Sequence, residues 1–263
     1  MPESEYNASL SGLSFVTDDI QGLGDLLLHW LADSTHRGTS TAPNRLLSYI
    51  NPHVYNLSML HPEVRQCLNQ SDRVCIDGIG IKLALFLKLR QNLPRVVAEH
   101  LFNDFVRRLS TPVNAIMVGV TSEEATAAAQ SLTQRNPNLM FTSTLDGFAD
   151  DATYCQFFQQ HETIPLILIG AGTPRSEQIA LMATQWCRGS VVFHIGAGTI
   201  KTWAGTKKCG PAVMSRLGLE WLHRIVYEPH TRTRYTVGAV EFARNLITRR
   251  NTPAHHTNNG DNT

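Results

Sequence analysis

Residues 165–186 read PLILIGAGTPRSEQIALMATQW, and this stretch decides the fold. An apolar run ends at Gly170, and a turn containing Gly172 leads into a helical pattern. The same unit recurs at 72–90, 113–135 and 191–205, and LMFTSTLDGF at 139–148 reads as a further strand. Continuous apolar strands that alternate with helices predict a Rossmann-like α/β fold, a parallel sheet with helices on both faces.

Two helix starts carry specific capping signals. Thr121 with Glu124 three residues later predicts a capping box. Thr173 followed by Pro174 predicts an N-cap residue with proline at the first helical position.

Composition limits the kinds of partner. The chain has 263 residues, of which 42% are hydrophobic, and its net charge is +1, so no overall field favours nucleic acid. Lys and Arg outnumber Asp and Glu from Lys201 onward, which favours a local anionic partner. The five cysteines form no C-x-x-C pair, which indicates a reducing compartment. The polar N-terminus does not read as a signal peptide, so any membrane contact is expected to be peripheral.

The chain divides into four predicted parts. Residues 1–12 and 251–263 are polar ends expected to be disordered, and 13–210 form the α/β core. Residues 211–250 form a helical, basic appendage containing RLGLEWLHRIVYE, which is rich in aromatic and basic side chains. Two interpretations of this appendage stay open: contact with anionic lipid, or packing on the sheet or on another subunit.

Ligands of parallel α/β sheets bind beyond the carboxyl ends of the strands. Here those ends carry turns whose backbone N–H groups suit a phosphate, at 77–78, 119–121, 146–147, 170–176 and 196–201. Three turns have the pattern G-x-G but none completes G-x-G-x-x-G, which disfavours a nicotinamide-dependent oxidoreductase. Alternatively, the glycines only permit tight turns. Three cations, Arg95, Arg175 and Lys201, are expected near this edge, either to neutralise a leaving diphosphate or as solvated surface charges.

Asp77 ends the apolar strand VCID and precedes a glycine turn. A partly desolvated carboxylate there suits a general base, and an N-cap role is equally compatible with the spacing. The sequence contains no D-x-D, no H-E-x-x-H and no Cys/His cluster, so no metal cofactor is expected.

Five motifs in order resemble the WecG/TagA/CpsF glycosyltransferases, over roughly 51–235: DGIG, NPNLMFTSTLDGF, GAGTPRSEQ, AGTKKCGP and GLEWLHRIVYEP. The resemblance implies metal-independent, inverting transfer from a UDP-sugar to a polyprenyl-diphosphate-linked sugar, in the synthesis of exopolysaccharide, capsule or wall polymer. It implies that Asp77 is the catalytic base and that Arg95 handles phosphate. It also implies that appendage arginines reach the acceptor's diphosphate, namely Arg224, Arg232 and Arg234.

The residues expected to bind the nucleotide-sugar are Asn51, Gly78, Gly119, Thr121, Asp146, Gly147, Gly170, Gly172, Pro174, Arg175, Ser176, Glu177, Gly198 and Lys201. The resemblance implies a cytoplasmic protein at the inner membrane face and suggests self-association. The chain departs from the family pattern at Tyr49, Ser176 and Lys201. These departures keep open an alternative function, a catalytically inactive nucleotide-binding scaffold.

Overall fold

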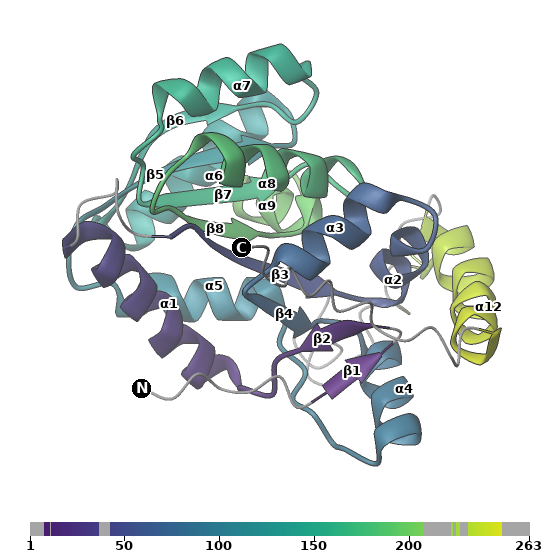
Figure 1. Ribbon diagram of the computed structural model, residues 1–263. Coiled ribbons are helices and arrows are strands. Elements are labelled where there is room, and N and C mark those ends of the chain that lie inside the picture. The colour runs from purple at the N-terminus through teal and green to yellow at the C-terminus, as the bar shows by residue number, and fades with distance from the viewer. Residues whose placement is uncertain are drawn as a thin grey trace, which may run out of the picture.

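The computed structural model describes residues 8–10, 12–36, 43–207, 222, 225–226 and 231–248. Its centre is a six-stranded sheet in the order β4-β3-β8-β7-β5-β6 (Figure 1). Every pair of neighbouring strands is parallel, which confirms the predicted α/β fold. The strands are β3 (Arg45–Ile50), β4 (Arg73–Ile76), β5 (Val113–Gly119), β6 (Leu139–Leu145), β7 (Leu166–Gly170) and β8 (Val191–His194), and a separate antiparallel pair is formed by β1 (Ala8–Leu10) and β2 (Leu13–Phe15).

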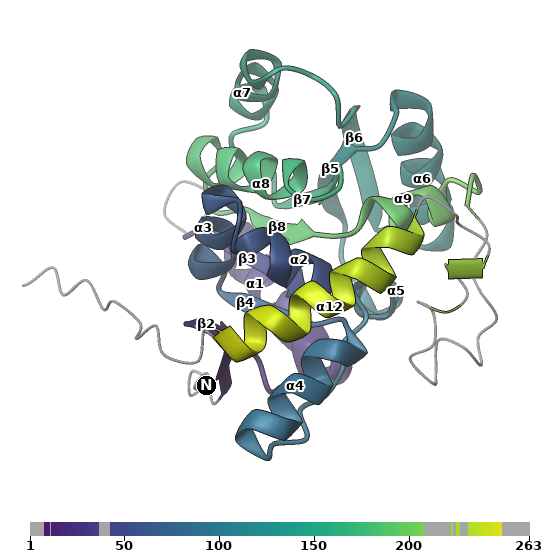
Figure 2. The same cartoon turned by 90° about the vertical axis from the view of Figure 1, so that its right-hand side faces the viewer.

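Helices cover both faces of the sheet (Figures 1 and 2). They are α1 (Ile20–His36), α2 (Pro52–Ser58), α3 (Pro62–Gln70), α4 (Ile79–Leu89), α5 (Ala98–Arg108), α6 (Ser122–Arg135), α7 (Asp151–Gln160), α8 (Arg175–Trp186), α9 (Ala197–Trp203) and α12 (Arg232–Thr248).

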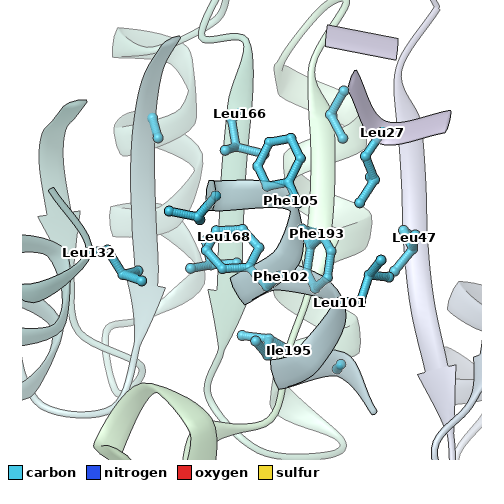
Figure 3. Packing of buried hydrophobic residues seen from close by; sticks show 14 of the residues in the cluster. Leu27, Leu47, Leu101, Phe102, Phe105, Leu132, Leu166, Leu168, Phe193 and Ile195 are labelled. Carbon is cyan, nitrogen blue, oxygen red and sulfur yellow. The ribbon is translucent and has the colours of Figure 1, made fainter. Parts of the chain in front are cut away.

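Three hydrophobic clusters hold the layers together. One lies between the sheet and α1, α5, α6 and α9, where Phe102 packs against Phe193 with ring centroids 5.0 Å apart (Figure 3). A second lies on the opposite face, under α7 and α8. All five residues of β7 are buried, because a central parallel strand has helices on both sides. The third cluster joins β1, β2, α2, α4 and α12 at the β4 end of the sheet.

The sequence patterns missed β3, although it lies inside the sheet. Its Ser48 is fully buried, and its hydroxyl lies 2.8 Å from the hydroxyl of Ser71. A polar residue inside a strand is tolerated when a partner is supplied from elsewhere in the fold, and the sequence does not reveal that partner.

The capping box of Thr121 and Glu124 is present at the start of α6 and confirms the prediction. The prediction that Thr173 caps α8 is wrong. The N-cap residue is Pro174, and the Thr173 hydroxyl donates instead to Glu177 Oε1, at 2.9 Å. A buried carboxylate needs hydrogen-bond donors, and Glu177 is fully buried, so the hydroxyl serves the side chain rather than the helix end.

Helix α12 packs on the core through one face. Phe242 is buried against Tyr55 of α2, with ring centroids 5.2 Å apart, and Asn56 Nδ2 donates to the carbonyl oxygen of Gly238 at 2.8 Å. Most of the predicted appendage, 208–221 included, lies outside the described residues. That 211–250 forms a separable part therefore stays a prediction. Among the helices that can be described, none is long and apolar enough to cross a membrane.

Candidate active site

The carboxyl ends of β3 and β4 form one half of the site. The amide of Asp77 donates to the carbonyl oxygen of Ile50 at 3.0 Å, which ties the two strand ends together. A β-carbon at Gly78 would lie 2.6 Å from Pro52 Cδ and 3.0 Å from Asn51 Cβ. Only glycine allows this approach, so the turn that carries Asp77 rests directly on the turn that carries Asn51.

The structure decides against Asp77 as a helix cap. The N-cap residue of α4 is Gly78, and it makes no side-chain capping bond. Arg95 follows α4 in the chain and returns to this turn, where its Nε donates to the carbonyl oxygen of Asp77 at 3.0 Å. Asp77 and Arg95, which the sequence predicted separately, are thus adjacent at the carboxyl ends of the strands. Both side chains are partly buried.

Asn51 has a structural task at the same edge. Its Oδ1 accepts from the amides of His53 and Val54, at 3.0 and 3.1 Å, and caps α2. Because the oxygen is engaged, the amide Nδ2 is the group of Asn51 that would meet a sugar. Direct contact with a substrate stays a prediction.

Helix α12 brings a cation to this half of the site. Arg234 lies close enough to His53 to act on it electrostatically. Burial, and secondly the positive charge of Arg234, lower the pKa of His53 to about 4, so this imidazole is neutral at pH 7. The buried Nε–H of Arg234 has no hydrogen-bond partner among the described residues, and an anionic oxygen could accept from it. Arg232 instead donates through Nε to the carbonyl oxygen of Ile225, and Arg224 lies outside the described residues.

The carboxyl ends of β5, β6 and β7 form the second half of the site, and glycines allow the turns after these strands to pack closely. A β-carbon at Gly119 would lie 2.3 Å from the carbonyl oxygen of Gly170. One at Gly147 would lie 2.9 Å from Ala171 Cβ. At these two positions glycine permits close packing between neighbouring turns. Gly172 differs, because its φ is +87° and, within the described part of the chain, no atom beyond its own and its two chain neighbours' would lie within 4 Å of a β-carbon there.

The carboxylate of Asp146 stabilises the turn that follows β6. Its Oδ1 accepts from the amide of Phe148 at 2.8 Å, and its Oδ2 accepts from the hydroxyl of Ser122 at 3.4 Å. Asp146 therefore links the end of β6 to the first turn of α6, beside Thr121. A role in binding the nucleotide-sugar stays a prediction for both residues.

Arg175 is engaged within the protein. It forms an ion pair with Asp151 at 2.8 Å and donates to the carbonyl oxygen of Ala149 at 2.8 Å. Its guanidinium also lies over the ring of Tyr154, 4.9 Å from the centroid. These contacts fix the loop between β6 and α7, and a leaving phosphate would have to compete with them.

Ser176 and Glu177 lie behind the turn at 170–174 with their side chains fully buried. Ser176 Oγ accepts from the amide of Ala171 at 2.7 Å, and Glu177 Oε1 accepts from Thr173. Both side chains shape the turn that includes Gly172 and Pro174. Their direct contact with a ligand stays a prediction.

His194 is a candidate site residue that the sequence analysis missed. It is the last residue of β8, with Nε2 4.0 Å from Glu177 Oε1 and its ring centroid 5.1 Å from that of Tyr49. Burial lowers the pKa of His194, and the Glu177 carboxylate opposes this only in part. A histidine that ends an apolar strand was the signal available in the sequence, because that position faces the ligand edge.

Lys201 pairs with the start of α6. Its Nζ lies 3.6 Å from Glu124 Oε2, and Thr206 donates to the other oxygen of that carboxylate at 2.8 Å. Burial would raise the pKa of Glu124, but the hydrogen bond from Thr206, the Thr121 amide and Lys201 together lower it. Near Gly198, a β-carbon would lie 3.3 Å from Lys207 Nζ. Two lysines thus lie around α9, which contacts β7 and α6 beside the second half of the site.

An open hollow of about 580 Å³ lies on the α1 and α5 side of Arg95. It is lined by Asp19, Ile20, Gln21, Pro94, Arg95, Asp104 and Arg108. Since none of the predicted strand-end turns lines it, we do not place the nucleotide there. Across the residues that the structure describes, no group of His, Cys, Asp and Glu side chains is arranged to hold a metal ion. Metal independence itself stays a prediction.

Comparison with known proteins decides the family. The model of the glycosyl transferase WecG/TagA/CpsF family matches residues 17–256, which is most of the chain. The chain belongs to this family. It is a glycosyltransferase, as the motifs at the strand ends indicated.

Two similar proteins come from Staphylococcus aureus strains NCTC 8325 / PS 47 and COL. Each is named N-acetylglucosaminyldiphosphoundecaprenol N-acetyl-beta-D-mannosaminyltransferase. Each is 25% identical to this WecG/TagA/CpsF glycosyltransferase over 189 residues, which cover 70% of this chain and 73% of the relative.

Proposed function

We propose that this glycosyltransferase moves a sugar from a UDP-sugar to a polyprenyl-diphosphate-linked sugar, with inversion and without a metal ion. One observation carries the proposal. The turn that carries Asp77 packs against the turn that carries Asn51, and Arg95 donates a hydrogen bond to the carbonyl oxygen of Asp77. Arg234 of α12 lies near His53, two residues after Asn51, and so adds a cation to the same end of the sheet. The names of the relatives support an acceptor of the same kind.

In the proposed reaction, the Asp77 carboxylate takes the proton of the acceptor hydroxyl. The hydroxyl oxygen attacks the anomeric carbon of the donor as the bond from that carbon to the UDP oxygen breaks. UDP leaves with the electron pair of that bond. One displacement at carbon inverts the configuration.

The negative charge that develops on UDP has to be neutralised without a metal ion. Backbone N–H groups of the turns after β5, β7 and β8 are suited to this task, together with the cations Lys201 and Lys207. The acceptor's diphosphate would lie at the other half of the site, near Arg95 and Arg234. Two anionic groups thus have two separate cationic regions.

The first test is release of UDP by the purified chain, given a panel of UDP-sugars, a short-chain polyprenyl-diphosphate-linked sugar and EDTA. UDP-N-acetylmannosamine heads the panel because of the relatives' names. We expect acceptor-dependent release with one donor, at a rate that EDTA does not change. Strict dependence on added Mg²⁺ would contradict the metal-free mechanism.

The Asp77→Asn variant tests the base. Its rate of transfer should fall about a thousandfold or more, because the variant lacks the proton acceptor, while its affinity for UDP stays within about threefold. An active Asp77→Asn enzyme would refute the assignment. UDP binding by the unmodified chain without release from any donor would favour the scaffold alternative.

A further inference from the structure

The exposed side of α4 is unusually apolar. Four large side chains on this helix are open to solvent: Ile79 (44% exposed), Leu83 (55%), Phe86 (44%) and Leu87 (61%). Their spacing of four, three and one residues places them on one stripe along the helix. The opposite side of α4, with Ile81 and Leu85, is buried in the cluster shared with α2 and α12. The helix therefore has an inner apolar face that the fold uses and an outer one that it does not.

The charged residues within α4 and the segment that follows it are all of one sign. Residues 79–95 read IGIKLALFLKLRQNLPR, which contains Lys82, Lys88, Arg90 and Arg95 and no carboxylate. Apolar side chains rimmed by cations complement an anionic bilayer surface, where the apolar groups enter the headgroup region and the cations meet lipid phosphates. A second copy joined symmetrically through the same face would bring cations against cations.

The neighbouring helix extends this surface. Phe242 of α12 lies close to the start of α4, 3.7 Å from a β-carbon built at Gly80, and Figures 1 and 2 both place the two helices on one side of the molecule. The outer side of α12 exposes Val237, Val240 and Ile247. By helical spacing, Arg244 and Glu241 lie at the same side of α12, and both are exposed.

We propose that the outer stripe of α4 (Ile79, Leu83, Phe86 and Leu87) docks the enzyme on an anionic membrane surface. This inference rests on the proposed function, in which the acceptor is lipid-linked. The N-cap residue of α4 is Gly78, directly after Asp77, so a docked helix would hold the carboxylate beside the bilayer where a lipid diphosphate lies. For 211–250 the sequence left membrane contact open beside packing, and the present proposal adds a helix of the α/β core as a membrane contact.

The test is co-sedimentation of the full chain with vesicles of phosphatidylcholine containing phosphatidylglycerol. We compare the unmodified protein with a Leu83→Gln/Leu87→Gln variant, in which both altered side chains are exposed and glutamine preserves helix propensity. The double variant should bind vesicles roughly tenfold more weakly or worse. Replacing the anionic vesicles by pure phosphatidylcholine should weaken binding by about fivefold for each cation engaged. The control is Met140→Gln, an exposed apolar residue of β6 at the far end of the sheet, which should bind like the unmodified protein.

Two results would overturn the inference: equal vesicle binding by the double variant and the unmodified chain, or no vesicle binding by either. A change in oligomeric state alone would assign the stripe to contact between copies and overturn it as well. Activity separates this inference from the proposed function. With a short, water-soluble acceptor the double variant should keep its rate, whereas with an acceptor embedded in vesicles it should lose rate in parallel with binding. If no donor supports transfer but vesicle binding still depends on Leu83 and Leu87, the docking surface stands and the proposed reaction fails.

Discussion

Phe242→Ala is the substitution that tests how α12 is joined to the enzyme. The Phe242 ring is 7% exposed and packs edge-on against Tyr55, 5.2 Å between centroids. Truncating a buried phenylalanine removes its transfer free energy and leaves a cavity, at a cost of about 3–5 kcal/mol. Because α12 lies at the outside of its cluster and can relax, we expect about 3 kcal/mol, still a large fraction of the stability of a typical domain.

The assay is urea unfolding followed by circular dichroism, with Val240→Ala as the matched control. Val240 belongs to the same helix but is 70% exposed, so its truncation should change the free energy of unfolding by less than about 0.5 kcal/mol. A second readout is the pKa of His53 by NMR titration. It should rise from about 4 toward its ordinary value if loosening α12 removes Arg234. A loss of stability under about 1 kcal/mol for Phe242→Ala would refute the argument and indicate that α12 is only loosely attached.

Two further perturbations address the β3–β4 half of the site. Gly78→Ala would place a β-carbon 2.6 Å from Pro52 Cδ, so it should cost about 1–3 kcal/mol in thermal unfolding and slow transfer by displacing Asp77. Unchanged stability and rate would show that the two turns are not in close contact. His53 has a folded pKa of about 4 against about 6.5 unfolded, so the unfolded chain binds a proton first as pH falls. The free energy of unfolding should therefore decrease between pH 6.5 and 4, by roughly 1–2 kcal/mol after allowing for partial solvent exposure. His53→Asn should lack this decrease, and an equal slope in both proteins would contradict the burial of His53.

The sheet was predictable from the sequence wherever strands are buried on both faces. Val113–Gly119 and Leu166–Gly170 are continuous apolar runs for that reason. The strand with Ser48 was missed, because the hydroxyl of Ser71 that makes its burial tolerable comes from elsewhere in the fold. Local patterns identify elements best when the local sequence carries the whole physical requirement.

The candidate site was likewise predictable only where a local sequence signal exists. A carboxylate at the end of an apolar strand made Asp77 the predicted base, because the carboxyl edge of a parallel sheet is the ligand edge. The arrangement of the other site residues depends on tertiary contacts, which leave no signal in the local sequence. The ion pair of Arg175 with Asp151, the burial of Glu177 beside His194 and the approach of Arg234 to His53 all join residues from different elements. Thr173 shows the limit most clearly, since a good local cap signal was overridden by a buried carboxylate four residues later.

The position of β8 has a consequence for how the chain folds while it is synthesised on the ribosome. Among the described strands, β3 and β4 form one pair and β7, β5 and β6 form another group, and β8 lies between them. Residues 191–194 are made long after 45–50, so the central seam of the sheet stays open until most of the protein has been synthesised. Contacts of such long sequence separation slow folding. Nascent chains stopped before residue 191 should therefore carry two unjoined pieces with exposed strand edges, the form most in need of a chaperone.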